Sequence, residues 1–149
     1  AMTGWRIGYA LGPASIIGGL VRIHQYTVMS SPTIAQIAAV EALADVDEAV
    51  QMMVEEYDRR RKFVVGEFNR IGLPTFEPKG AFYAFPKVSV TGLDDEAFAE
   101  RLLNEERVAI VPGSAFGAGG EGFCRCSYAT SYEKLERAIT RIERFVNRL

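Results

Sequence analysis

Two arginines occupy positions where a charged side chain needs an explanation. Arg125 lies within an apolar run, residues 123–128, that is typical of a strand. In a strand, its side chain lies on the side opposite Cys124 and Cys126. There it must face either solvent, as on an edge strand, or an anion. Arg6 lies between Gly4 and Gly8, and such glycines allow close approach to the backbone. Because a guanidinium binds phosphate or carboxylate through paired hydrogen bonds, both arginines are candidate anion-binding residues.

Other reactive groups lack the partners that catalysis or metal binding requires. His24 is the only histidine and falls in a predicted amphipathic helix, where a surface or hydrogen-bonded role is favoured. Ser114 therefore has no second histidine to activate it, which argues against a serine hydrolase. Cys124 and Cys126 would be about 6.5 Å apart on one face of a strand, near the limit for a disulfide. We predict two reduced core thiols and no metal site.

Composition and charge favour an ordinary globular chain. Its 149 residues are 48% apolar and 24% charged, with a formal net charge of −2. The basic run at 59–62 is preceded by acids, giving the expected pairs Glu55–Arg59, Glu56–Arg60 and Asp58–Lys62 on a helix surface. The uncharged run 7–21 is shorter than a bilayer span and rich in glycine. We therefore expect a cytoplasmic protein that binds neither nucleic acid nor membranes.

The elements that position these residues change in character along the chain. Before Pro74, apolar spacing predicts helices over 14–26, from Pro32 through Leu43 with Ser31 as N-cap, and over 46–72 with Asp45 or Asp47 as N-cap. After it, short strands alternate with helices. Strands are predicted at 81–85, 108–111 and 123–128, one helix is capped by Asp94 or Asp95, and the last has a Thr130–Glu133 capping box. Residues 74–149 are predicted to form a small α/β sandwich with a mostly antiparallel sheet.

Several blocks of sequence together resemble one enzyme family. The chain from Ala1 to Tyr9 is similar to the stretch that follows the cofactor lysine in class I/II aminotransferases, the fold type I enzymes that use pyridoxal phosphate. Further similar blocks follow in the family's order at residues 24–26, 31–36, 80–86, 111–117 and 125–129. The resemblance implies an α/β fold in which residues 1–45 end the large cofactor domain, 46–73 form an interdomain helix and 74–149 form the C-terminal small domain.

The resemblance also assigns roles to the two arginines. It implies that Arg6 binds the cofactor phosphate and that Arg125 binds the substrate α-carboxylate. Phe82 would line the mouth of the active site or pack in the core. The cofactor lysine would lie three residues before Ala1, outside this sequence, and none of the lysines at 62, 79, 87 and 134 matches it. The chain is therefore expected to be a C-terminal portion without a catalytic residue, inactive alone.

The implied parent enzyme is a homodimer that moves an amino group between an amino acid and a 2-oxo acid. A lyase of the same fold, such as a carbon–sulfur lyase, is one alternative, since it would share the scaffold and the carboxylate arginine. A stand-alone interaction or structural domain is another. If residues 1–45 belong to a larger domain, their apolar face should be exposed in this chain.

Overall fold

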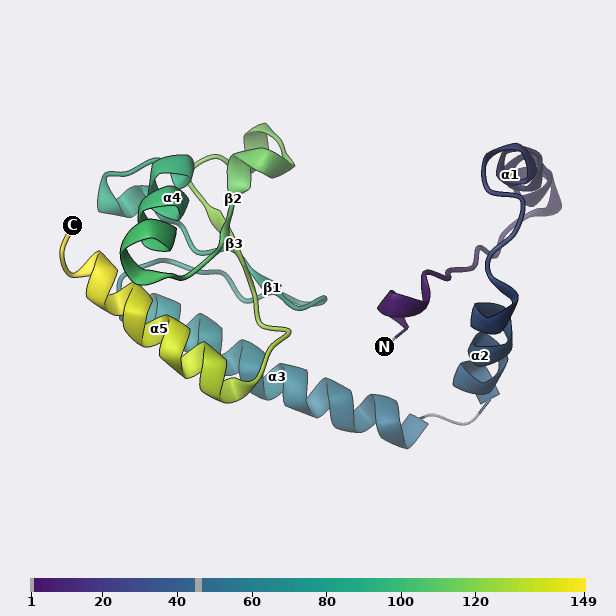
Figure 1. The fold of residues 1–149 in the computed structure, drawn as a ribbon, viewed down its shortest axis with the longest axis horizontal. Coiled ribbons are helices and arrows are strands. Elements are labelled where there is room, and N and C mark those ends of the chain that lie inside the picture. The colour runs from purple at the N-terminus through teal and green to yellow at the C-terminus, as the bar shows by residue number, and fades with distance from the viewer. Residues whose placement is uncertain (1, 45–46) are drawn as a thin grey trace. The chain divides into compact units, whose positions relative to one another are not determined.

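The computed structural model describes residues 2–44 and 47–149 (Figure 1). The chain forms two compact units, Ala1–Met52 and Met53–Leu149, and each is described by itself. The first unit contains the short 3-10 turn Thr3–Trp5 and helices α1 (Ala14–Thr27) and α2 (Thr33–Ala44). Helix α3 (Asp47–Arg70) begins in the first unit and continues into the second.

Prolines set the beginnings of the first two helices. The Pro13 carbonyl accepts the N–H groups of Ile16 and Ile17, so α1 begins one residue after the proline, close to its predicted start. Pro32 occupies the same place before α2, where its carbonyl accepts from Ala35 and Gln36. The predicted N-cap at Ser31 is therefore wrong by one residue. Asp45, one of the caps considered for α3, lies outside the described residues.

Apolar side chains of α1 and α2 are largely exposed. No residue of α1 is buried, and Ala35 is the one buried residue of α2. Isoleucine, leucine and valine supply most of the exposed surface: Ile16, Leu20, Val21, Ile23, Ile34, Ile37, Val40 and Leu43. The apolar surface expected of residues 1–45 is therefore present in this chain.

The second unit contains a small antiparallel sheet. Its order is β1 (Tyr83–Ala84), β3 (Cys124–Ser127) and β2 (Val111–Pro112). Tyr83 pairs with Ser127 on one side of β3, and Val111 pairs with Arg125 on the other. The mixture of helices and a small antiparallel sheet agrees with the predicted fold class.

All three predicted strands are longer than the observed ones, most of all those predicted at 81–85 and 108–111. Ala81 has a left-handed backbone with φ of 57°, which is incompatible with extended structure, so the predicted strand 81–85 shrinks to β1. Residues 108–110 form no β pairing within the described part of the chain, and β2 includes only Val111 of the predicted strand 108–111. Residues 108–110 instead line a groove together with Cys126 and Ser127 of β3.

Helices α4 (Asp95–Glu106) and α5 (Tyr132–Val146) are capped by side chains. The Asp94 carboxylate accepts the Ala97 N–H at 2.7 Å. Asp94 is therefore the N-cap of α4, as one of the two predicted alternatives, Asp94 or Asp95, states. The predicted Thr130–Glu133 box is wrong, because Ser131 is the N-cap and accepts the Lys134 N–H at 3.4 Å. No helix of residues 2–44 and 47–149 is both long enough and apolar enough to cross a bilayer.

The core of the second unit lies between the sheet and helices α3, α4 and α5. Figure 1 shows α5 running beside α3, where the rings of Phe63 and Tyr132 lie 4.7 Å apart. Helices α4 and α5 meet through Phe98 and Phe145, whose rings pack edge to face at 5.2 Å. Buried side chains from these elements and from the segments between them form one cluster: Val64, Phe68, Leu73, Ala84, Val88, Phe98, Ala99, Leu102, Cys124, Tyr128, Leu135, Ile139, Ile142 and Phe145.

Candidate functional site

Arg125 lies between two aromatic rings. Its guanidinium carbon is 4.4 Å from the ring centre of Tyr83 and 4.4 Å from that of Phe116. The side chain is half-buried, and it forms no ion pair with any carboxylate in the described part of the chain. An aromatic face attracts a guanidinium through the charge of the cation, and this contact does not use the N–H donors, which lie in the plane of the guanidinium. The arrangement therefore holds the guanidinium in place and leaves its hydrogen-bond donors for an anion.

Strand β1 supplies the first ring. Tyr83 pairs with Ser127 in the sheet, and residues two apart on a strand share a face, so Tyr83 lies on the same face as Arg125. Phe82 stacks instead on Tyr57 of α3, at 6.0 Å, and packs against the core. Phe82 thus packs against the core, which is one of the two roles considered for it, and its ring also lies 4.6 Å from that of Tyr83, which contacts the arginine.

A tightly folded glycine-rich loop supplies the second ring. Phe116 ends the 3-10 turn Gly113–Phe116, which is followed by a second turn, Ala118–Gly120. The backbones of Gly113 and Gly120 pack directly together: a Cβ at Gly113 would lie 2.0 Å from the Gly120 carbonyl oxygen. Only glycine permits this approach, which brings the two ends of the loop together and holds Phe116 over Arg125.

A buried carboxylate fastens the same loop to α4. Asp95 is only 5% exposed, and its two oxygens accept the N–H groups of Ser114 at 2.8 Å and Gly122 at 3.1 Å. Burial opposes ionisation, but the hydrogen bonds from Ser114 and Gly122 outweigh it and lower the pKa of Asp95 to about 2. The ionised side chain thus positions the loop that carries Phe116.

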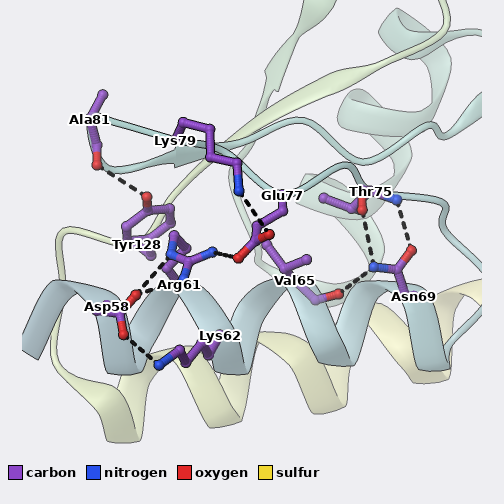
Figure 2. A network of polar contacts seen from close by, with 10 residues as sticks. All are labelled: Asp58, Arg61, Lys62, Val65, Asn69, Thr75, Glu77, Lys79, Ala81 and Tyr128. Carbon is purple, nitrogen blue, oxygen red and sulfur yellow. Dashed lines mark hydrogen bonds and ion pairs between the residues drawn. The ribbon is translucent and has the colours of Figure 1, made fainter.

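Polar contacts from α3 hold the segment that leads into β1 (Figure 2). The Asn69 side chain donates to the Thr75 carbonyl at 3.0 Å and accepts the Thr75 N–H at 2.9 Å. Arg61 bridges Asp58 on its own helix and Glu77 on the segment. The Tyr128 hydroxyl donates to the Ala81 carbonyl at 3.1 Å, just before β1. These contacts fix the start of the strand that carries Tyr83.

The basic run on α3 is neutralised by acids on the same helix. Glu56 pairs with Arg60 at 2.7 Å, and Asp58 pairs with Lys62 at 2.6 Å, which confirms two of the expected ion pairs. Arg59 also pairs with Glu56, three residues before it. Hydrogen bonds from Arg59 and Arg60 lower the pKa of Glu56 to about 2. The run is therefore paired with carboxylates, on its own helix and, through Arg61, on the segment before β1.

The remaining reactive groups are poor nucleophiles or lack a metal-binding arrangement. Cys124 is a buried free thiol, and Cys126 is a partly buried free thiol. Burial raises the pKa of both to about 12, with the Asp95 charge adding to the effect at Cys124. His24 is exposed on α1. Within the residues that the structure describes, no group of three or more metal-ligating side chains comes together.

Arg6 lies in the first unit with an exposed guanidinium. Its backbone is left-handed, with φ of 53°, and its Nη1 donates to the Thr3 carbonyl at 3.2 Å. It has no ion pair with an acid in the described ranges 2–44 and 47–149. A guanidinium without a carboxylate partner suits a phosphate group in charge and in hydrogen-bond geometry.

Sequence reasoning missed three residues of the Arg125 site. Tyr83 and Phe116 are ordinary apolar residues in the sequence, and only the pairing of β1 with β3 and the fold of the loop bring them to the arginine. Asp95 was considered only as a helix cap. The consecutive acids Asp94 and Asp95 are a partial signal of a second role, because a helix N-cap uses only one of them.

Comparison with known proteins places the chain in a family. The model of the family "Aminotransferase class I and II" matches residues 1–142. The aspartate aminotransferase of Pyrococcus abyssi is 51% identical over 146 residues, which cover 97% of this chain and 38% of that protein. The aromatic-amino-acid aminotransferase 2 of Thermococcus litoralis is 48% identical over 146 residues, with the same two shares.

Solved structures agree with the sequence matches. The crystal structure of an aromatic aminotransferase from Pyrococcus horikoshii OT3 matches with a TM-score of 0.92 and 51% identity, covering 99% of this chain and 40% of that one. The chain thus spans about 38% of the length of the curated relatives it matches. With the family model matching nearly all of its residues, the chain belongs to the class I and II aminotransferases, a family whose members use pyridoxal phosphate.

Proposed function

We propose that this chain supplies the carboxylate-binding part of a pyridoxal-phosphate-dependent aminotransferase, which moves an amino group between an amino acid and a 2-oxo acid. In this proposal residues 1–45 complete the cofactor domain, 46–73 form the connecting helix and 74–149 form the small domain of a homodimeric enzyme. The observation that carries it is the guanidinium of Arg125, held between Tyr83 and Phe116 without an acidic partner.

Arg125 is proposed to bind the α-carboxylate of the substrate. Two parallel N–H donors of a guanidinium match the two oxygens of a carboxylate, so binding also fixes the direction of the substrate. The rings of Tyr83 and Phe116 limit the rotation of the guanidinium and exclude water from its faces. Such orientation lowers the barrier for a reaction at the carbon next to the carboxylate.

Arg6 is proposed to bind the phosphate group of the cofactor. Its exposed guanidinium, which has no acidic partner among the described residues, fits a phosphate dianion, and the neighbouring Gly4 and Gly8 leave open space around the backbone. The bound cofactor supplies an electron sink for the bonds of the substrate amino acid. Lys62 and Lys79 are engaged in ion pairs with Asp58 and Glu77, and no lysine of this sequence is assigned a catalytic role. We therefore propose that the chain alone does not transaminate.

The two arginines can be tested against each other in an enzyme of full family length that contains these residues. Arg125→Ala should raise the KM for the amino acid and slow turnover by about two orders of magnitude or more, because orientation is lost with binding. Arg125→Lys, which keeps the charge and loses the planar fork, should recover only part of the activity. Arg6→Ala should mainly weaken cofactor retention, measured by absorbance after dialysis. Unchanged kinetics in Arg125→Ala would overturn the assignment.

The products distinguish aminotransfer from a lyase reaction. With an amino acid and 2-oxoglutarate, the proposed activity forms the matching keto acid and glutamate in equal amounts. Release of pyruvate and ammonia from a cysteine-like substrate, without glutamate, would instead identify the carbon–sulfur lyase considered above.

A further inference from the structure

A groove rich in positive charge lies between α5 and the segment 107–110. Its volume is about 410 Å³, within the range of sites that bind small molecules. Its cationic side chains are Arg107 at the end of α4 and Lys134, Arg137 and Arg141 on α5. No carboxylate lines it among the residues that the structure describes. The spacing of the α5 cations, three and four residues apart, places them along one helix face.

The cations of this groove differ from most others in the second unit. The remaining lysines and arginines of Met53–Leu149, apart from Lys87 and Arg125, are in ion pairs: Arg59, Arg60, Arg61, Lys62, Arg70, Lys79, Arg101, Arg144 and Arg148. The groove cations have no such partner in the described part of the chain. Arg141 donates one bond, from Nη1 to the Glu106 carbonyl at 3.2 Å. Unpaired positive charge is therefore concentrated in one hollow of a chain whose net charge is −2.

The groove is separate from the Arg125 site. Cys126 lines the groove, whereas Arg125, its neighbour on β3, contacts Tyr83 and Phe116. Neither Arg125 nor its two aromatic neighbours line the groove, so the two sites share no side chain among the described residues. Residues 108–110 form no β pairing within the described part of the chain, and they line the groove together with Ser127 and Thr130.

We propose that this groove binds a small multivalent oxyanion, a compound with at least two phosphate or carboxylate groups. Several cations that converge on one hollow raise the local concentration of such an anion. Guanidinium groups then bind its oxygens through charge-assisted hydrogen bonds. A monovalent anion would leave most of the positive charge uncompensated, so multivalent ligands are favoured.

Isothermal titration of the 149-residue chain tests this site with two probes, inorganic pyrophosphate and citrate. Saturable binding with one ligand per chain is expected, and the tighter probe identifies phosphate or carboxylate as the preferred group. The double variant Lys134→Gln/Arg137→Gln should weaken binding about tenfold or more, because two charge-assisted contacts are lost. Both side chains are exposed on a helix, and glutamine preserves helix propensity.

A matched control removes the same charge elsewhere. The double variant Lys62→Gln/Lys87→Gln alters two exposed lysines outside the groove and should change the dissociation constant by less than about twofold. Arg6→Gln and Arg125→Gln should also leave binding intact. Absent binding, equal weakening in the control, or loss in either single variant would overturn the proposal. Amide chemical shifts provide a second readout, since pyrophosphate should move those of residues 107–110 and 134–141.

Discussion

Replacing Asp95 with asparagine should loosen the glycine-rich loop and release Phe116 from Arg125. The Asp95 carboxylate accepts two backbone N–H groups, from Ser114 and Gly122. Asparagine keeps one acceptor oxygen but puts an NH₂ group, which is a donor, opposite the other N–H. One loop amide would then be left buried without an acceptor.

The expected cost follows from the pKa of the carboxyl group. The pKa of Asp95 falls from 3.8 to about 2 on folding, and one pKa unit corresponds to about 1.4 kcal/mol, so ionised Asp95 stabilises the fold by about 2 kcal/mol. Loss of a hydrogen bond to a charged group is of the same size, about 1.5–3 kcal/mol. We therefore expect Asp95→Asn to lower the free energy of unfolding of the second unit by about 2 kcal/mol.

This stabilisation depends on pH in a defined direction. Because folding lowers the pKa of Asp95, its contribution is present above the ordinary value of 3.8 and is lost as the pH falls toward 2. The difference in unfolding free energy between the native chain and Asp95→Asn should therefore be large at pH 7 and shrink below pH 4.

Urea unfolding followed by circular dichroism, together with amide hydrogen exchange, measures both effects. The amides of Ser114 and Gly122 should exchange faster in Asp95→Asn. Asp94→Asn is the matched control, because asparagine is as good an N-cap as aspartate and should change stability by only a few tenths of a kcal/mol. Equal stability losses in the two variants, or an Asp95→Asn effect that is the same at pH 7 and pH 2.5, would refute the reasoning.

Two further substitutions test the supports of the site. Gly113→Ala should destabilise the fold by about 1–3 kcal/mol or more, because its Cβ would lie 2.0 Å from the Gly120 carbonyl oxygen. Gly66→Ala is the control, because a Cβ at this exposed helical position would have no other atom within 4 Å. This substitution should raise the free energy of unfolding by about 0.5–1 kcal/mol, and thermal unfolding compares the two variants. Glu106→Gln should lower the Tm at neutral pH, because buried Glu106 pairs with Arg144 and Arg148. Hydrogen bonds from these arginines lower the pKa of Glu106 to about 2, so the Tm difference should shrink as the pH falls below 4.5. A Tm gap at pH 2.5 as large as the gap at neutral pH would contradict this.

Local sequence signals were sufficient for the helices and for the position of β3. Helical spacing and proline breaks located α1, α2 and α3 to within a few residues, because both act over one or two turns. The capping residue of α5 was misjudged because adjacent Thr130 and Ser131 can both cap, and only the backbone conformation of Ser131 selects it.

Tertiary structure decided what surrounds the chemically interesting residues. Motifs in the order of the family predicted the family, and a charged residue inside an apolar segment pointed to Arg125. Nothing local could show that Tyr83 and Phe116 enclose its guanidinium, since they lie 42 and 9 residues away in the printed sequence. Likewise, nothing local could show that one groove is lined by Arg107 and by three cations of α5, Lys134, Arg137 and Arg141. Periodicity identifies a side chain's face on its own element, whereas contacts between elements depend on how the whole core packs.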